Sequence, residues 1–566
     1  MMKRGHALMV VTVVSLIFLV FFIYPSLSVL SEAFRNPDGG FTASFVIEVF
    51  RNPVYLEGLW NALLLGVVST IACFLISMPL ALVSHRYDFF GKKILGVLVL
   101  IPLVLPPFVG AIGLTRVLSV TGSLNSLLID IGLMDGDQRY DWLAEGRFWG
   151  IVVMNALHLY PILLMNISAA LSNMDPAMEQ AAENLGCSPF RRLFRITLPL
   201  AMPGIFAGAS IVFIWAFTEL GVPLVFNYTR VAPVQVFQGI KDLGGNPAPY
   251  ALVAVMLLVS SVVFGLTKYF FGRSTSGSQP RPKGRGNEIK LPPIASFGAA
   301  ALFLGVFLVA SIPHAGVVAL ALSEDWYDSL VPLAWTLDHF KEALGDPLVV
   351  PSIENSLVYA SIATLVAAVL GLAIAWVVVR SRIRGRLILD ALVMLPLAVP
   401  GLVLAFGYLA LSREGKPLHF MVTMAGGSPA LLLIAAYAVR RLPYVVRAAV
   451  AGLQQSNPAM EEAARSLGAG PWRTLRRISI PLIGANVAAG SILAFAFAML
   501  EVSDSLILAE QAQHYPITKA IYTLLGNLGN GQELAAALGT WAMVFLAVAI
   551  IGATRLAGKK GGLFRM

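Results

Sequence analysis

Long apolar runs alternate with shorter polar stretches along the chain. Six runs lie at 7–30, 59–83, 94–118, 148–171, 200–226 and 250–271, and six more at 294–322, 353–379, 387–411, 429–452, 484–508 and 535–557. Each has the length of roughly 20 residues that an α-helix needs to cross the hydrocarbon core of a bilayer. The pattern therefore predicts an all-α polytopic membrane protein with about 12 transmembrane helices.

The two groups of six runs are repeats of one another. Asn61-Ala62-Leu63 matches Asn355-Ser356-Leu357, and further along Pro102 and Gly113 match Pro396 and Gly407. Because each half has an even number of spans, the copies are parallel, and a pseudo-two-fold axis should run along the membrane normal. We expect a first repeat at 1–271, a basic flexible linker at 272–293 and a second repeat at 294–566.

Charge in the loops predicts the orientation. Hydrophobic residues make up 57% of the chain, charged residues 13%, and the net charge is +9, which in such a protein indicates basic cytoplasmic loops rather than a nucleic-acid surface. The loops at 84–93 and 380–386 are basic, whereas those at 119–147 and 323–352 are acidic. The positive-inside rule thus places both termini and the linker in the cytoplasm.

Two polar islands interrupt the apolar pattern at corresponding places, at 175–199 and 457–481. Asp175-Pro176 and Asn457-Pro458 each put a good N-cap side chain before a proline at the first helical position. Gly186 and Gly468 should end these short helices, and a second helix with a basic face should follow. By the same charge rule both islands are cytoplasmic.

Three acidic residues, Glu219, Glu501 and Asp504, lie inside apolar runs. Ionisable groups there are costly and usually face a cavity or a partner, so we expect either a translocation path for a cationic or polar solute or structural bonds to a neighbouring helix. Arg440 and Arg441 lie in another span and point in different directions, which predicts that at least one snorkels or pairs with an acidic group.

Prolines break the third span of each half, which shapes a cavity or makes a packing kink. Their positions are Pro102, Pro106, Pro107, Pro396 and Pro400. No spacing of His or Cys residues indicates a metal site, and no Gly-x-x-x-x-Gly-Lys-Ser/Thr motif occurs. We therefore predict a non-enzymatic chain without a cofactor of its own.

The islands share the pattern Glu-Ala-Ala, three residues, Gly, nine residues, Ile, one residue, Leu-Pro. The second island fits it from Glu462 to Pro481 with Ile480 in place of Leu, and the first fits it with Gln180 in place of Glu. This pattern resembles the cytoplasmic coupling loop of permease subunits of binding-protein-dependent ABC importers. The resemblance implies two tandem permease repeats of the MetI-like type and assigns the ATPase-coupling residues Glu179, Gln180, Ala181, Ala182, Gly186, Glu461, Glu462, Ala463, Ala464 and Gly468.

The same resemblance implies the partners. Two copies of an ABC ATPase carrying ATP and Mg²⁺ would dock on the islands, and a periplasmic or lipid-anchored binding protein would deliver a small solute at the bacterial inner membrane. A fused tandem permease is most similar to the iron(III) branch, with thiamine, polyamine and phosphonate branches nearby. The alternative is a secondary transporter of the major facilitator kind, which also has six plus six spans but no use for paired islands.

Overall fold

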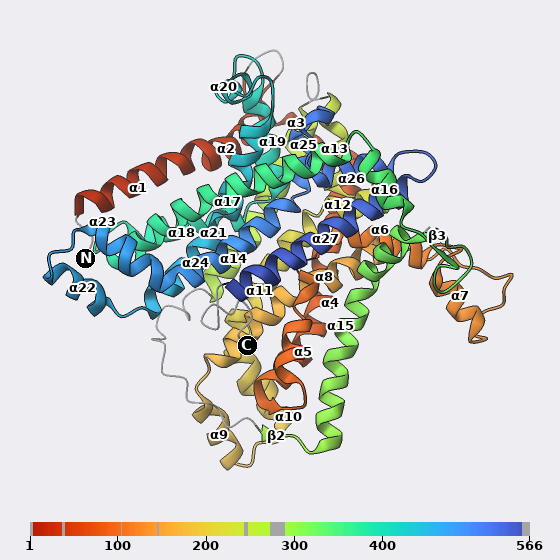
Figure 1. The fold of residues 1–566 in the computed structure, drawn as a ribbon, viewed down its shortest axis with the longest axis horizontal. Coiled ribbons are helices and arrows are strands. Elements are labelled where there is room, and N and C mark those ends of the chain that lie inside the picture. Colours follow the sequence, from red (N-terminus) through yellow and green to blue (C-terminus); the bar gives the residue numbers. More distant parts are fainter. Residues whose placement is uncertain are drawn as a thin grey trace. The chain divides into compact units, whose positions relative to one another are not determined.

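The computed structural model describes residues 4–36, 40–103, 105–143, 146–242, 247–271 and 289–556, and the statements below concern these residues. Most of the expected linker, 272–288, and the basic C-terminal tail at 557–566 lie outside them. Within the described ranges the chain is mainly helical, as predicted (Figure 1). The only strands there are two short pairs, β1 (Tyr87–Asp88) with β2 (Ile289–Lys290), and β3 (Ser323–Asp325) with β4 (Ala334–Trp335).

The helices of the first half are α1 (Arg4–Phe18), α2 (Tyr24–Ala33), α3 (Ser44–Arg51), α4 (Pro53–Arg86), α5 (Lys92–Leu98), α6 (Pro107–Leu118), α7 (Ser123–Asp130), α8 (Arg147–Ser172), α9 (Pro176–Asn184), α10 (Pro189–Arg192), α11 (Leu198–Phe217), α12 (Gly221–Val225), α13 (Ala232–Gln238) and α14 (Ala248–Phe271). Single π-helical turns at Leu19–Ile23 and Leu193–Thr197 join α1 to α2 and α10 to α11. Short 3₁₀ turns lie at Ile101–Leu103 and Gly239–Asp242.

The helices of the second half are α15 (Pro293–Ala321), α16 (Asp338–Gly345), α17 (Val349–Arg380), α18 (Arg386–Met394), α19 (Gly401–Ser412), α20 (His419–Met424), α21 (Ala430–Gln455), α22 (Pro458–Ser466), α23 (Pro471–Thr474), α24 (Ile480–Met499), α25 (Ser503–Leu508), α26 (Ile517–Leu525) and α27 (Gly531–Leu556). A π-helical turn at Leu475–Ser479 joins α23 to α24, at the place that corresponds to Leu193–Thr197. Short 3₁₀ turns lie at Leu395–Leu397 and Ala512–His514.

Ten stretches of the described chain are long and apolar enough to cross a membrane, and a bent pair of helices makes an eleventh. The remaining predicted span, 429–452, is α21, a 26-residue helix whose three arginines, Arg440, Arg441 and Arg447, keep it out of that set. The prediction of about 12 spans fits these helices. The twelfth, α21, is missing from the apolar set because of its three arginines. Charges that a bilayer would not accept singly must be neutralised within the protein.

The third span of the second half is broken where its prolines predicted a break. The segments Arg386–Leu397 and Gly401–Ser412 meet at 94°. Pro400 has an extended backbone (φ −56°, ψ 139°) directly before α19. In the first half Pro106 has the same extended form (φ −69°, ψ 124°) before α6. Because the backbone of a proline cannot continue the hydrogen-bond ladder of a helix, both spans restart after the break.

The described chain folds into two compact units, whose boundaries differ from those of the two sequence repeats. Of the described residues, those within 4–52, 236–257 and 337–556 form one unit, and those within 53–235 and 258–336 form the other. The first span of each half therefore packs within the unit built mainly from the other half: α2 lies along α19, and α15 lies along α6 (Figure 1). The predicted repeat boundaries describe the sequence and stay a prediction, whereas the packing exchanges the first spans.

Glycine makes each of these exchanged contacts close. A Cβ on Gly407 of α19 would lie 2.3 Å from the carbonyl oxygen of Pro25 in α2, and one on Gly113 of α6 would lie 2.1 Å from that of Pro313 in α15. Helices in membranes associate through such small residues, since these allow the two backbones to approach. The glycines that match between the halves thus mark the same crossing in each unit.

Candidate functional site

The first island folds as its sequence predicts. The Asp175 carboxylate accepts a hydrogen bond from the Ala177 N–H (3.0 Å) at the start of α9. At the other end, Gly186 has φ +76°, its N–H donates to the Glu183 carbonyl, and the Cys187 N–H donates to the Ala182 carbonyl. This pair of bonds around a left-handed glycine is a Schellman motif, which stops the helix and turns the chain back.

The second island repeats this geometry. Asn457 caps α22 by accepting from the Ala459 N–H (3.0 Å), and Gly468 has φ +80°. The Gly468 and Ala469 N–H groups donate to the Arg465 and Ala464 carbonyls, respectively. Nothing lies within 4 Å of a Cβ placed on Gly186 or Gly468, so the backbone conformation rather than space requires glycine at both positions.

The residues assigned to coupling divide between two faces of each short helix. Glu461, Ala464 and Ala182 are buried and Glu179 is half-buried, so these four pack the helices onto the protein. The outward residues of the set are Gln180, Ala181, Gly186, Glu462, Ala463 and Gly468. At this position the first island therefore presents the neutral Gln180 to a partner, and the second island presents the anionic Glu462.

Large apolar side chains accompany the outward residues. On the first island Leu185 and Phe190 are 88% and 73% exposed, and on the second Leu467 and Trp472 are 89% and 72% exposed. Apolar groups so exposed and so closely matched between two copies are typical of a surface that is covered in an assembly. Each island therefore has the composition of a docking surface, with apolar anchors beside a short capped helix.

Glu501 and Asp504, the two acidic residues inside an apolar run of the second half, lie in a buried charge cluster with Arg440 and Arg441. Arg440 Nη1 donates to Glu501 Oε1 (2.5 Å) and to Asp504 Oδ2 (2.9 Å), and Arg441 Nη2 donates to Glu501 Oε2. The side chains of Glu501 and Asp504 are 5% and 0% exposed. Both arginines thus pair with acidic groups, and the formal charges of the cluster cancel.

This charge cluster joins the breaks in two spans to a third span that is one continuous helix. Arg440 and Arg441 lie in α21, whereas Glu501 and Asp504 lie where α24 ends and α25 begins. The Arg440 guanidinium also lies against Gly401 at the start of α19, since a Cβ there would be only 2.3 Å from its Nη1. A guanidinium fork suits this position because it can serve several acceptors in fixed directions.

Glu219, the repeat equivalent of Glu501, has different surroundings. Its Oε1 accepts from the N–H groups of Gly221 (2.9 Å) and Val222 (3.2 Å), so it caps α12. At the position equivalent to Arg440 stands His158, whose Nδ1 lies 2.9 Å from the carbonyl oxygen of Pro102 at the broken third span. The structure brings Glu501 and Asp504 together but leaves Glu219 in the other compact unit.

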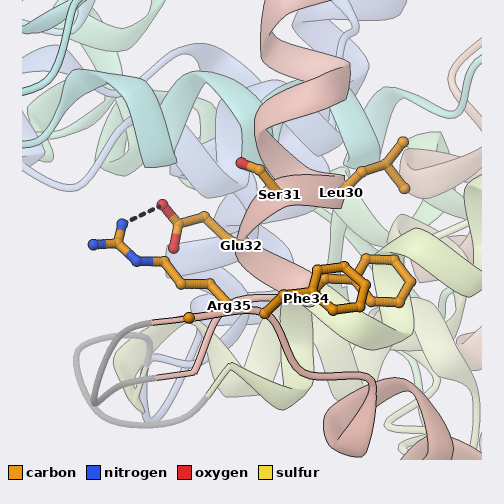
Figure 2. Close-up of a pocket in the computed structure, with 7 residues that line it drawn as sticks. Leu30, Ser31, Glu32, Phe34 and Arg35 are labelled. Atoms are coloured by element: carbon orange, nitrogen blue, oxygen red, sulfur yellow. Dashed lines mark hydrogen bonds and ion pairs between the residues drawn. The ribbon is translucent and has the colours of Figure 1, made fainter.

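A shallow pocket lies at the end of the first span (Figure 2). Its lining residues are Leu30, Ser31, Glu32, Phe34, Arg35, Gly40 and Phe41. Its one carboxylate, on Glu32, is bound by Arg35 (3.5 Å) and by Lys416 (3.3 Å), and Phe34 stacks on Phe41 at 5.3 Å between ring centroids. Since two cations already pair with Glu32, the pocket offers no unpaired carboxylate to a ligand. Among the described residues no group of three or more His, Cys, Asp or Glu side chains is placed to hold a metal ion.

Comparison with known proteins gives a family match over both halves. The model of a family described as binding-protein-dependent transport system inner membrane component matches residues 74–277 and 367–556. The ferric transport system permease protein FbpB of Actinobacillus pleuropneumoniae is 27% identical over 524 residues, 90% of this chain and 72% of that protein. The Fe(3+)-transport system permease protein FbpB 2 of Haemophilus influenzae is 26% identical over 84% of this chain and 85% of its own length.

A third relative covers only part of the chain. The spermidine/putrescine transport system permease protein PotB of Haemophilus influenzae is 32% identical over 200 residues, 34% of this chain and 68% of that protein.

Proposed function

The chain belongs to the family of inner membrane components of binding-protein-dependent transport systems, and we propose that it is the fused permease of an importer for ferric iron. It is a permease of the ABC importer class, with two tandem MetI-like repeats in one multi-pass membrane chain. The family match covers both halves and disfavours the secondary transporter considered above.

The tandem organisation of the relatives carries the proposal for iron. The two relatives named for ferric transport align over 90% and 84% of this chain, whereas the polyamine permease aligns over 34%. A match that runs through both repeats compares the whole translocation unit, and a match to one half compares only the shared permease plan. Iron(III) is therefore favoured over a polyamine as the cargo.

The two islands are the proposed docking sites for the ATPase subunits. Their capped helices present Gln180 and Glu462 with exposed apolar neighbours, and the inward residues fasten each helix to its own bundle. Two copies of an ABC ATPase, each binding ATP and Mg²⁺, would occupy the two islands. Closure of the ATPases around ATP would then move the islands, and the helices that follow them would pass this movement to the spans.

The orientation and the path complete the proposal. By the positive-inside rule, the basic loops support a cytoplasmic position for the islands and both termini in a bacterium. A periplasmic or lipid-anchored binding protein would then deliver iron at the opposite face. Glu219, Glu501 and Asp504 remain the proposed acidic groups of the path. Because the charge cluster engages Glu501 and Asp504 with arginines, their exposure to a cation would require these ion pairs to open.

Reconstitution tests the cargo directly. The chain would be placed in vesicles with an ABC ATPase from the same genome inside and a binding protein loaded with radioactive ferric iron outside. We expect ATP-dependent accumulation of iron that unlabelled ferric-loaded binding protein competes away. ATP-driven uptake of spermidine, thiamine or a phosphonate with no uptake of iron would replace the proposed cargo and keep the importer class.

A further inference from the structure

Arg380, the last residue of α17, reaches the second island. Its Nε lies 3.2 Å from both carboxylate oxygens of Glu461 in α22. Its Nη2 donates to the Ser456 side chain (2.7 Å) and to the Ser456 carbonyl (3.3 Å), directly after α21. The side chains of Arg380 and Glu461 are 10% and 4% exposed, so this ion pair is shielded from solvent.

Glu461 extends the same network to a third span. Its Oε1 also accepts a hydrogen bond from the Ser479 hydroxyl (3.2 Å), at the junction with α24. One arginine and one glutamate thereby tie the island to the cytoplasmic ends of α17, α21 and α24. A guanidinium can serve the carboxylate and the serine at once because its donors diverge in a fixed fork, whereas an ammonium could not hold both directions.

The first island is fastened differently. Arg86 and Glu179 stand at the positions equivalent to Arg380 and Glu461. Both belong to the described part of the chain, where no ion pair joins them, and Glu179 instead accepts a hydrogen bond from the Thr197 hydroxyl. Bracing there is local, because Arg192 pairs with Glu183 across the turn of the island (2.5 Å between Nη1 and Oε2).

The second island lacks the residues for that local brace. The sequence positions that correspond to Glu183 and Arg192 hold Arg465 and Thr474, so the same pair cannot form. The first island is therefore stiffened across its own turn, whereas the second island is held by a charge on α17.

We propose that Arg380 is the positioning residue that couples the second island to α17, and that the two islands consequently transmit movement to their spans by unequal routes. The inference rests on the proposed function in so far as it concerns ATPase subunits. Its physical basis is the burial of the pair: removal of one partner leaves an uncompensated charge, so the pair should stay closed while the island moves. Movement of α22 would pull on α17 directly, whereas movement of α9 would reach its bundle through the chain that follows the island.

Thiol accessibility tests the anchoring without any partner. In a Cys187→Ser background, whose remaining native cysteine, Cys73, is buried, one new cysteine at a time replaces a buried alanine: Ala464→Cys in α22 or Ala182→Cys in α9. Arg380→Met should raise the labelling rate at position 464 by about tenfold, because local opening of α22 no longer breaks a buried ion pair. The matched variant Arg86→Met should leave labelling at position 182 unchanged. Unchanged labelling at 464, or an equal rise at both positions, would overturn the proposal.

Two further variants separate the pair from a general loss of structure. Arg380→Lys keeps a charge but loses the fork, and it should label at an intermediate rate. Arg380→Met combined with Glu461→Met removes both charges, so its labelling should lie below that of Arg380→Met alone, since coupled residues are not additive. If the effect of the double variant on the labelling rate, expressed as free energy, equals the sum of the effects of Arg380→Met and Glu461→Met alone, a direct interaction is contradicted.

Transport then tests the coupling. In vesicles with the ATPase and the loaded binding protein, Arg380→Met should lower the amount of solute taken up per ATP hydrolysed and leave the KM for ATP unchanged, whereas Arg86→Met should preserve the ratio. An unaltered ratio in Arg380→Met would refute the coupling role. If the wild-type chain recruits no ATPase, the proposed function fails, and the thiol measurements still decide whether Arg380 anchors the island.

Discussion

Replacement of Glu501 by glutamine should destabilise the protein far more than the same change at its repeat partner Glu219. At position 501 the change leaves Arg440 and Arg441 facing the single carboxylate of Asp504 inside a buried charge cluster. At position 219 the amide oxygen of glutamine can still accept from the backbone N–H groups of α12. The two glutamates therefore offer a matched comparison of one chemical change in two environments.

The structure sets the size of the difference. Breaking a buried ion pair by removing one partner costs about 3–5 kcal/mol, because an uncompensated charge remains. Replacing a carboxylate that accepts backbone N–H bonds by a neutral acceptor costs about 1 kcal/mol. With a shift of about 2–4 °C in midpoint per kcal/mol for a unit of this size, Glu501→Gln should lower the midpoint by roughly 6–20 °C and Glu219→Gln by a few degrees.

The assay heats the detergent-solubilised protein at one fixed scan rate, because unfolding of such proteins is irreversible, and measures the fraction that stays monodisperse. A second change, Arg441→Met in the Glu501→Gln chain, removes the excess cation and should recover part of the loss. Equal midpoints for the two single variants, or a double variant less stable than Glu501→Gln, would refute the reasoning. Uptake by the surviving protein tests the path: both single variants should transport more slowly while still binding the ATPase.

Three further predictions follow from other parts of the structure. Cysteines at Asp137 and Ser188 test the orientation, since an impermeant thiol reagent should label only the first in intact cells, and labelling of the second would reverse the topology. Gly407→Val should push α19 from α2 and lower the yield of folded protein, whereas normal yield and thermal stability would exclude the close crossing. Gln180→Lys should weaken ATPase binding less than Glu462→Lys, because only the latter replaces a negative charge, and equal losses in a pull-down would contradict this.

The sequence predicted local structure correctly where that structure depends on interactions between residues that are close in the chain. Asp175-Pro176 before an alanine-rich stretch and Gly186 after it predicted the start and the end of α9, and the structure has both. Likewise Pro400 predicted the broken third span. These features depend on the φ angle of proline, on side-chain capping and on left-handed glycine, all of which act within a few residues.

Contacts between distant residues were not predictable in the same way. Arg380 meets Glu461 across 81 positions of sequence, and the pattern that identified the islands did not distinguish the inward Glu461 from the outward Glu462. Which face of a short helix is buried depends on the bundle that it packs against, and that packing is a property of the fold. The exchange of the first spans is of the same kind, since α2 and α19 are far apart in sequence and meet only through the packing of the fold and a long hydrogen bond from Ser28 to the Gly407 carbonyl.

The pairing of Arg440 with Glu501 lies between these cases. The position of both arginines in an apolar run predicted that at least one of them snorkels or pairs with an acidic group, and the structure shows that both pair and identifies their partners. The repeat pattern predicted that Glu219 and Glu501 are equivalent, but their surroundings differ. Glu219 caps a helix, and His158 occupies the position equivalent to Arg440 in its half. Glu501 belongs to an ion-pair cluster with Arg440 itself.

ATP hydrolysis in reconstituted vesicles tests the central claim, that the islands couple an ATPase to transport, most directly. Gly468→Val imposes a left-handed backbone on a β-branched residue, at a cost of about 1–2 kcal/mol, and should misalign α22 without disturbing the apolar spans. Glu462→Lys keeps the helix and reverses its outward charge. With the ATPase and the loaded binding protein present, both variants should insert normally and lose most of the substrate-stimulated hydrolysis of the wild type. Full wild-type stimulation in both variants would contradict the account.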